Sequence, residues 1–266
     1  MDISGDTLQL LRALVVAVEG NKDVPDDADG RVRYAEGIAL KCFIHAASVL
    51  YLSRSTTVPE LGVSFFDPAS MNALARAAIE SFLVFHYVIA APQAEAEGEL
   101  RYLSWVLADL MERQELPATL QEEQERPRQE KHRIESIKSR IQQNVAFKKL
   151  TPKQQKKLLQ KKEWRRQSWA EIAKSAGLSQ LHSQRAYRYL CSYAHSGSLS
   201  VMQVSQARTK TDQQFLAQNA LRLVNVALAF MAEAYCSMFP KARAALANET
   251  ELTTKVDEWI QLGKKA

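Results

Sequence analysis

The stretch PASMNALARAAIESFLVFHYVIA, residues 68–90, decides the fold class of this chain. With its alanines included, this stretch is apolar on nearly all sides of a helix with 3.6 residues per turn. Its larger apolar residues are Leu74, Ile79, Phe82, Leu83, Phe85, Val88 and Ile89. The preceding Asp-Pro pair (residues 67–68) is typical of a helix start, with a capping carboxylate followed by proline at the first helical position. A helix that is apolar all round belongs at the centre of a helical bundle.

The segments on either side of this helix also show helical periodicity. Glycine and proline are scarce, at 9 and 8 of 266 residues, and alternation with period two is hard to find. The pattern predicts an all-α bundle of about nine or ten helices without a sheet, formed by a single domain over residues 1–266. Further helices are expected near residues 6–18, 32–53, 95–114, 120–150, 152–161, 169–176, 179–195, 212–239 and 250–262.

Composition predicts a soluble protein of the cytoplasm. Charged residues make up 24% of the chain, as in ordinary globular proteins. The N-terminus has no positive leader before its apolar run, so we expect no signal peptide. The longest apolar runs, residues 14–18 and 82–91, are shorter than a bilayer-spanning helix, and we expect no membrane contact. Cys42, Cys191 and Cys236 are odd in number and widely spaced, which predicts buried free thiols.

The charge distribution is strongly uneven. Residues 126–166 contain fifteen Lys and Arg but only three Asp and Glu, while the rest of the chain is acidic. We therefore predict a basic helical arm, residues 117–166, that is inserted in the domain and protrudes from it. Such an excess suits a phosphate backbone, with RNA favoured over DNA, or an acidic protein surface, and a solvated helical arm is the plain alternative. The predicted nucleic-acid-binding residues are Lys148, Lys149, Lys153, Lys156, Lys157, Lys161, Lys162, Arg165 and Arg166.

One charged pair lies within the apolar helix 68–90. Arg76 and Glu80 are four residues apart, so their side chains share a face within salt-bridge reach. Charges in a core helix must be paired or used, because burying one alone is costly. We expect this pair to form a polar core that clamps the helix to a neighbour, and the alternative is that it lines a site.

A second polar group lies in RAYRYLCSYAHSG, residues 185–197. Arg188 and His195 are seven residues apart, which places them on one helical face with Ser192 between them and Tyr187 on a neighbouring stripe. A histidine beside a fixed guanidinium is suited to RNA cleavage, where one group moves a proton and the other stabilises the phosphate charge.

The segment SWAEIAKSAGLSQLHSQRAYRYL, residues 168–190, resembles a helix-turn-helix. Its turn would be formed by residues 177–179, and the second helix would read DNA. The positions that should hold aliphatic residues in that second helix carry Ser183 and Ala186 instead.

A second resemblance covers residues 68–195. ARAAIESFLVFHYVI, a Trp-containing segment and then YRYLCSYAHSG resemble a poorly characterised bacterial helical family related to HEPN (higher eukaryote and prokaryote nucleotide-binding) proteins. The resemblance implies a metal-independent endoribonuclease of a phage-defence or toxin–antitoxin system that acts as a homodimer. In it, Arg188 and His195 would be catalytic, with Ser192 and Tyr187 in support and Arg76 and Glu80 as the core pair.

The leading alternative is a non-catalytic module that binds nucleic acid or a protein through the basic arm. Motifs for dinucleotides, nucleoside triphosphates, zinc proteases and serine hydrolases are all missing from the sequence, and its histidines are scattered. We therefore expect neither a cofactor nor a metal.

Overall fold

The structure is a computed structural model that describes residues 2–22, 30–115 and 125–265, with side chains omitted for 125–129. The described part of the chain forms two compact units. Unit 1 comprises Met1–His86 and Trp169–Ala266, and unit 2 comprises Tyr87–Ser168. The predicted basic arm falls within unit 2, its residues 117–124 lying outside the described residues. The fold is all-α, as predicted, but the described residues form thirteen α-helices rather than the expected nine or ten.

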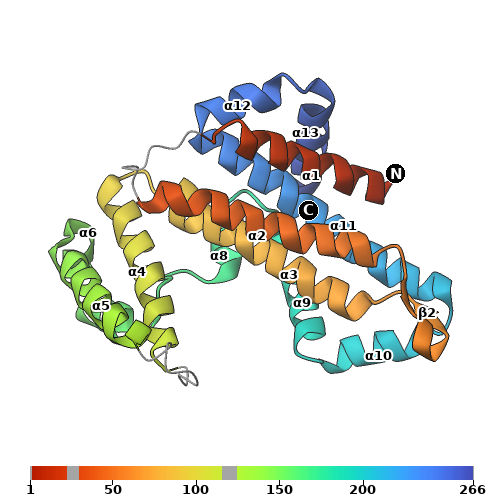
Figure 1. The fold of residues 1–266 in the computed structure, drawn as a ribbon, viewed down its shortest axis with the longest axis horizontal. Helices are drawn as coiled ribbons and strands as arrows, with labels where there is room; N and C mark the ends of the chain where they lie inside the picture. Colours follow the sequence, from red (N-terminus) through yellow and green to blue (C-terminus); the bar gives the residue numbers. More distant parts are fainter. Residues whose placement is uncertain (1, 23–29, 116–124, 266) are drawn as a thin grey trace. The chain divides into compact units, whose positions relative to one another are not determined.

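Unit 1 is a helical bundle with one small hairpin. Its helices and strands are α1 (Ile3–Glu19), α2 (Gly30–Leu52), β1 (Thr56–Val58), β2 (Val63–Phe65), α3 (Pro68–Phe85), α8 (Trp169–Ser175), α9 (Tyr187–Ala194), α10 (Ser198–Gln206), α11 (Lys210–Met238), α12 (Pro240–Ala247) and α13 (Thr250–Lys264), with a 3-10 turn η1 (Pro59–Leu61) and a π-helical turn η4 (Leu181–Ala186). Figure 1 shows α1, α2, α3 and α11 lying side by side, and these helices pack against one another.

The centre of unit 1 is formed by α3 and α11, which pack against each other through aromatic side chains. The Phe82 ring of α3 meets the Phe230 ring of α11 edge-on at 5.7 Å between centroids, and Phe85 lies 5.8 Å from Tyr235. The start of α3 is capped as predicted, since the Asp67 carboxylate accepts a hydrogen bond from the Ser70 backbone at 2.9 Å. The predicted central position of this helix is therefore confirmed within unit 1.

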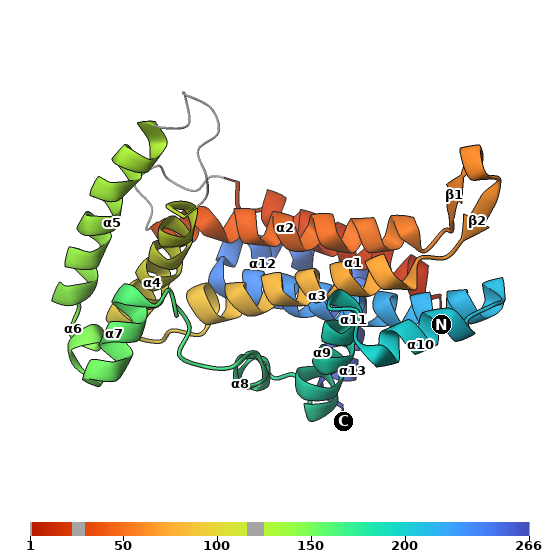
Figure 2. The same cartoon turned by 90° about the horizontal axis from the view of Figure 1, so that it is seen from below.

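The expectation of a chain without a sheet is wrong at one place. β1 and β2 pair antiparallel, with Thr56 opposite Phe65, and Figure 2 shows the hairpin where α2 leads into α3. Three β-branched residues favour the extended first strand. Gly62, with φ of 63°, then provides the left-handed residue that turns the chain back.

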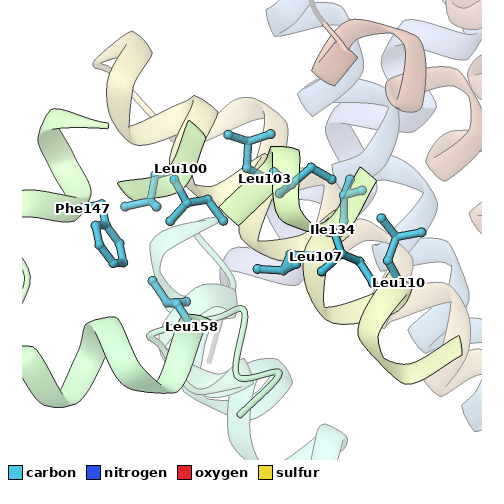
Figure 3. Packing of buried hydrophobic residues seen from close by; sticks show 10 residues of the cluster. Leu100, Leu103, Leu107, Leu110, Ile134, Phe147 and Leu158 are labelled. Carbon is cyan, nitrogen blue, oxygen red and sulfur yellow. The ribbon is translucent and has the colours of Figure 1, made fainter. Parts of the chain in front are cut away.

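The part of unit 2 that the structure describes contains four α-helices, which are α4 (Glu95–Arg113), α5 (Glu125–Gln143), α6 (Val145–Lys148) and α7 (Pro152–Gln160). Figure 3 shows its core, in which leucines of α4 and Ile134 of α5 form one apolar cluster with Phe147 and Leu158. The predicted long basic helix breaks at Asn144, whose side chain caps α6 by accepting from two backbone N–H groups. This break contributes to the higher helix count.

Three helices are long and apolar enough to cross a membrane by length and composition alone, among the residues searched. They are Gly30–Leu52, Pro68–Ala90, where the π-helical turn η2 (His86–Ala90) extends α3, and Lys210–Met238. The shortness of uninterrupted apolar runs therefore does not exclude a membrane helix, contrary to the sequence-based expectation. In unit 1, 72% of the apolar window of α11 is buried inside the protein, so packing accounts for much of its apolarity. The cytoplasmic location stays a prediction.

Candidate functional site

Four polar side chains from α3 and α9 meet in unit 1. Arg76 Nε donates to Glu80 Oε1 at 2.9 Å, and the Tyr187 hydroxyl donates to the same oxygen at 2.6 Å. Arg76 Nη1 lies 3.0 Å from His195 Nε2, and its Cζ lies 5.6 Å from the centroid of the Tyr187 ring. We call Arg76, Glu80, Tyr187 and His195 the polar cluster.

The polar cluster forms because α9 packs on α3 (Figure 2). Arg76 and Glu80 sit one turn apart on α3, as predicted. Tyr187 begins α9 and His195 follows its last residue, and these two side chains reach the two ends of the Arg76–Glu80 pair. The clamp between α3 and a neighbouring helix is therefore present, and it also brings a histidine to a guanidinium.

Charge and burial explain how the polar cluster is held. Burial opposes the charge of Arg76, but the Glu80 carboxylate outweighs it and raises the pKa of the guanidinium. Burial and the hydrogen bond to Glu80 raise the pKa of Tyr187 well above its ordinary value. The phenol therefore stays protonated at neutral pH and keeps donating to Glu80.

The contact between Arg76 and His195 fixes the histidine tautomer. A guanidinium has donors only, so His195 Nε2 must accept the hydrogen bond and its proton must sit on Nδ1. The His195 side chain is exposed, whereas the Arg76 side chain is only 21% exposed. An unprotonated ring nitrogen thus lies next to a fixed positive charge at the surface.

Ser192 lies in the last turn of α9, and its backbone carbonyl supports the turn that follows this helix. Its carbonyl accepts from the backbone of Gly197 at 2.7 Å and from the Ser200 hydroxyl at 2.9 Å. A Cβ on Gly197 would lie 2.5 Å from Ser192 Oγ, so a larger residue there would require the Ser192 side chain to move. Ser196 takes a left-handed conformation, with φ of 51°. This tight turn follows the end of α9 at Ala194 and begins with His195.

Arg188 is exposed on α9, and the guanidinium that the structure brings to His195 is that of Arg76. Leu190 and Tyr193 are buried on the inward side of α9, as expected for a helix that packs on a core. Cys42 and Cys236 are buried free thiols, as predicted, whereas Cys191 is half-buried.

The predicted nucleic-acid-binding residues of unit 2 differ in their partners and in their exposure. Three of them are paired with carboxylates: Lys157 lies 2.5 Å from Glu163, Lys162 lies 2.6 Å from Glu115, and Arg166 pairs with Glu97. Arg165 is half-buried and donates to the Gln167 carbonyl at 3.0 Å. The exposed lysines among them are Lys148, Lys149, Lys153, Lys156 and Lys161.

A hollow of about 290 Å³ lies in the same part of unit 2. Lys153, Lys157, Arg165 and Arg166 line it, opposed by the single carboxylate of Glu163. We call it the basic hollow. Four cations around one cavity produce a positive potential suited to an anionic group.

Two further features concern the predicted chemistry. In the described part of the chain, no group of three or more His, Cys, Asp or Glu side chains is placed to hold a metal ion. The helix-turn-helix segment folds as α8, a turn at Gly177 with φ of 88°, and then η4 and α9. Here the second helix begins with a π-helical turn, and Ser183 is buried at one of its internal positions.

Local spacing in the sequence could not predict the polar cluster, because Arg76 and His195 are 119 positions apart.

No curated protein and no solved structure matches the chain. A family of unknown function (DUF5677) matches residues 59–214, more than half of the chain and the whole of the segment from α3 to α9. The chain therefore belongs to the DUF5677 family.

Proposed function

We propose that the protein is a metal-independent endoribonuclease in which His195 and Arg76 act together. The observation that supports this most directly is the 3.0 Å contact between the exposed His195 Nε2 and Arg76 Nη1. RNA cleavage requires a base for the 2′-hydroxyl and a positive group for the phosphate, and this pair supplies both types of group. The resemblance to HEPN proteins points to the same chemistry.

In the proposed reaction, a phosphate oxygen of the RNA takes the hydrogen bond of Arg76 Nη1 and frees His195 Nε2. That nitrogen then accepts the proton of the 2′-hydroxyl. The bond between the 2′-oxygen and phosphorus forms, the bond between phosphorus and the 5′-oxygen breaks, and water protonates the leaving oxygen. The products are a 2′,3′-cyclic phosphate and a 5′-hydroxyl. The guanidinium stabilises the charge that develops on the phosphate.

The other predicted residues act in support. Glu80 positions Arg76 through the 2.9 Å bond, and Tyr187 holds Glu80 from the other side. We propose that Arg188 contacts a neighbouring phosphate, since it is exposed on the helix that carries His195. Ser192 shapes the turn that ends this helix. A cytoplasmic homodimer in a defence or toxin–antitoxin system remains our proposal for the context, drawn from the resemblance.

A second function is favoured by the basic hollow. Four cations and one carboxylate line it, and five of the predicted lysines of unit 2 are exposed. A non-catalytic protein would use this surface to hold a phosphate backbone or an acidic partner. If all five exposed lysines contact single-stranded RNA, log K should fall with log salt with a slope of about −3 to −4. Binding without salt dependence would argue against a phosphate backbone.

The deciding experiment incubates the purified protein with tRNA and mixed RNA without divalent ions. We expect the wild type to leave 2′,3′-cyclic phosphate ends and His195→Ala to be at least about 100-fold slower, as is typical for loss of a general base. His132→Ala, an exposed histidine of unit 2, is the matched control and should cleave normally. Thermal unfolding checks that each variant is folded. Equal rates for the wild type and His195→Ala would refute the catalytic role of His195. A wild type that does not cleave RNA would refute the endoribonuclease and favour the non-catalytic binding function.

A further inference from the structure

A second hollow, of about 370 Å³, lies in unit 1 beside the π-helical turn η4. From the chain segment η4–α9 it is lined by Leu181, His182, Arg185, Ala186 and Tyr189. The last four of these residues have the spacing i, i+3, i+4 and i+7 of one helical face. We call this cavity the η4 hollow, and its volume is within the range of small-molecule sites.

The opposite wall of the η4 hollow comes from α11. Asn219, Arg222 and Leu223 line it, again with the spacing i, i+3, i+4 of a single helical face. Two helical faces from distant parts of the sequence therefore meet across one cavity. Arg222 Nη1 approaches Asn219 Oδ1 at 3.4 Å, which leaves its other nitrogens available to a ligand.

The residues of the η4 hollow divide into an apolar base and a cationic rim. Ala186, Tyr189 and Leu223 are half-buried, whereas Arg185 and Arg222 are exposed. The residues that line the cavity include no carboxylate, so the two guanidinium groups are not neutralised within it. Burial lowers the pKa of His182, whose Nδ1 lies 3.0 Å from the Ser179 hydroxyl, so this imidazole is neutral at pH 7.

The tyrosine of the η4 hollow is held in place from behind. The rings of Tyr189 and Tyr193 lie 5.1 Å apart, and the Tyr189 hydroxyl donates to that of Tyr193 at 3.4 Å. The Tyr193 hydroxyl in turn donates to Gln203 of α10 at 3.1 Å. An aromatic ring fixed beside two arginines suits a planar ligand that also carries an anionic group.

We propose that the η4 hollow binds a nucleoside phosphate. The nucleobase stacks on the Tyr189 ring, above the half-buried residues of the cavity. The phosphate accepts hydrogen bonds from Arg185 and Arg222. A π-helical turn is a frequent feature of functional sites, and here it begins the ligand-facing wall. The nucleotide is either free in solution or part of an RNA strand.

This site is separate from the polar cluster. Tyr187 and Tyr189 are two residues apart, so about 200° of helix rotation separates them, and Tyr187 contacts Glu80 of α3 while Tyr189 lines the hollow beside α11. Binding at the η4 hollow therefore does not require that the polar cluster cleaves RNA. The test is made in the His195→Ala background as well as in the wild type.

The experiment measures binding of adenosine 5′-monophosphate by titration calorimetry, with adenosine, inorganic phosphate and a five-nucleotide RNA as separate arms. We expect adenosine monophosphate to bind more tightly than adenosine or phosphate alone. Arg185→Ala combined with Arg222→Ala should weaken it by about tenfold or more, since a charge-assisted hydrogen bond accounts for at least that factor. Tyr189→Ala should weaken it further than Tyr189→Phe, which keeps the ring.

The controls separate the η4 hollow from general charge effects. Arg208→Ala removes an exposed arginine outside the hollow and should leave the affinity unchanged. Both targeted arginines are exposed, so their replacement should not impair folding, and thermal unfolding checks this. Tighter binding of the RNA than of the free nucleotide, lost in the same variants, would identify RNA as the source. A wild type that does not bind adenosine monophosphate at about 10 mM, or a double arginine variant that binds equally well, overturns the proposal.

Discussion

The hydroxyl of Tyr187 provides a sharp test of the polar cluster. It donates to Glu80 Oε1 at 2.6 Å, and the same oxygen accepts from Arg76 Nε at 2.9 Å. Tyr187→Phe removes one oxygen atom and keeps the ring near Arg76. The variant therefore isolates the bond by which α9 is held to the charged pair of α3.

The expected loss follows from the surroundings of Glu80. A hydrogen bond to a charged group contributes about 1.5–3 kcal/mol to the free energy of unfolding. The Glu80 side chain is 28% exposed and retains its ion pair with Arg76 in the variant. Water can therefore replace part of the hydrogen bonding that the Tyr187 hydroxyl provides. We expect the lower end of that range, about 1.5 kcal/mol. In a protein of this size, that lowers Tm by about 3–6 °C.

The assay is urea unfolding followed by circular dichroism, with thermal unfolding alongside. Tyr51→Phe is the matched control, because Tyr51 is 75% exposed and its hydroxyl can be replaced by water, and we expect no change. Tyr187→Phe combined with Glu80→Gln completes a double-mutant cycle and should give a coupling free energy of about 1 kcal/mol. If Tyr187→Phe unfolds within about 0.3 kcal/mol of wild type, the hydroxyl does not clamp α9 to α3, and the reasoning fails.

Two further outcomes are expected. Leu107→Ala, within the apolar core of unit 2, should cost about 2–5 kcal/mol in urea unfolding, because Leu107 is fully buried and a cavity remains. Burial lowers the pKa of His182 in the folded state, so the unfolded chain binds a proton first as the pH falls below about 6.5, and stability falls with it. As the pH falls from 7 to the lowered pKa of folded His182, His182→Gln should lose less free energy of unfolding than the wild type. Equal losses in the two proteins would contradict this.

The central elements of unit 1 could be predicted because sequence and packing agree there. The apolar residues of α3 surround the helix, and Asp67 and Pro68 mark its start. At the start of α11, Thr209 and Asp212 form reciprocal cap hydrogen bonds, so the helix begins close to the predicted residue 212. Periodicity and capping act locally, and both can be recognised without knowing the partner helix.

Elements without a buried apolar stripe were missed. Residues 198–206 lie outside the predicted helices, yet they form α10, whose Leu199, Val201 and Met202 stay exposed while Ser200 is the buried residue. This inverts the usual pattern, so periodicity cannot indicate the helix. Pro240 lies just after the helix predicted over residues 212–239, but it starts α12 at the first helical position, where its missing N–H costs nothing.

The candidate site shows where local spacing stops being informative. Seven-residue spacing within one helix predicts that Arg188 accompanies His195, whereas the packing of α9 on α3 brings Arg76 to it. The difference has a consequence for function. An exposed arginine on α9 would be free to change rotamer, but Arg76 is fixed by Glu80 and only 21% exposed. That geometry depends on how α3 packs. Substitutions that loosen the core around α3, such as Phe82→Leu, should therefore shift the Arg76–His195 contact. They should change any activity that depends on this contact, although neither residue is replaced.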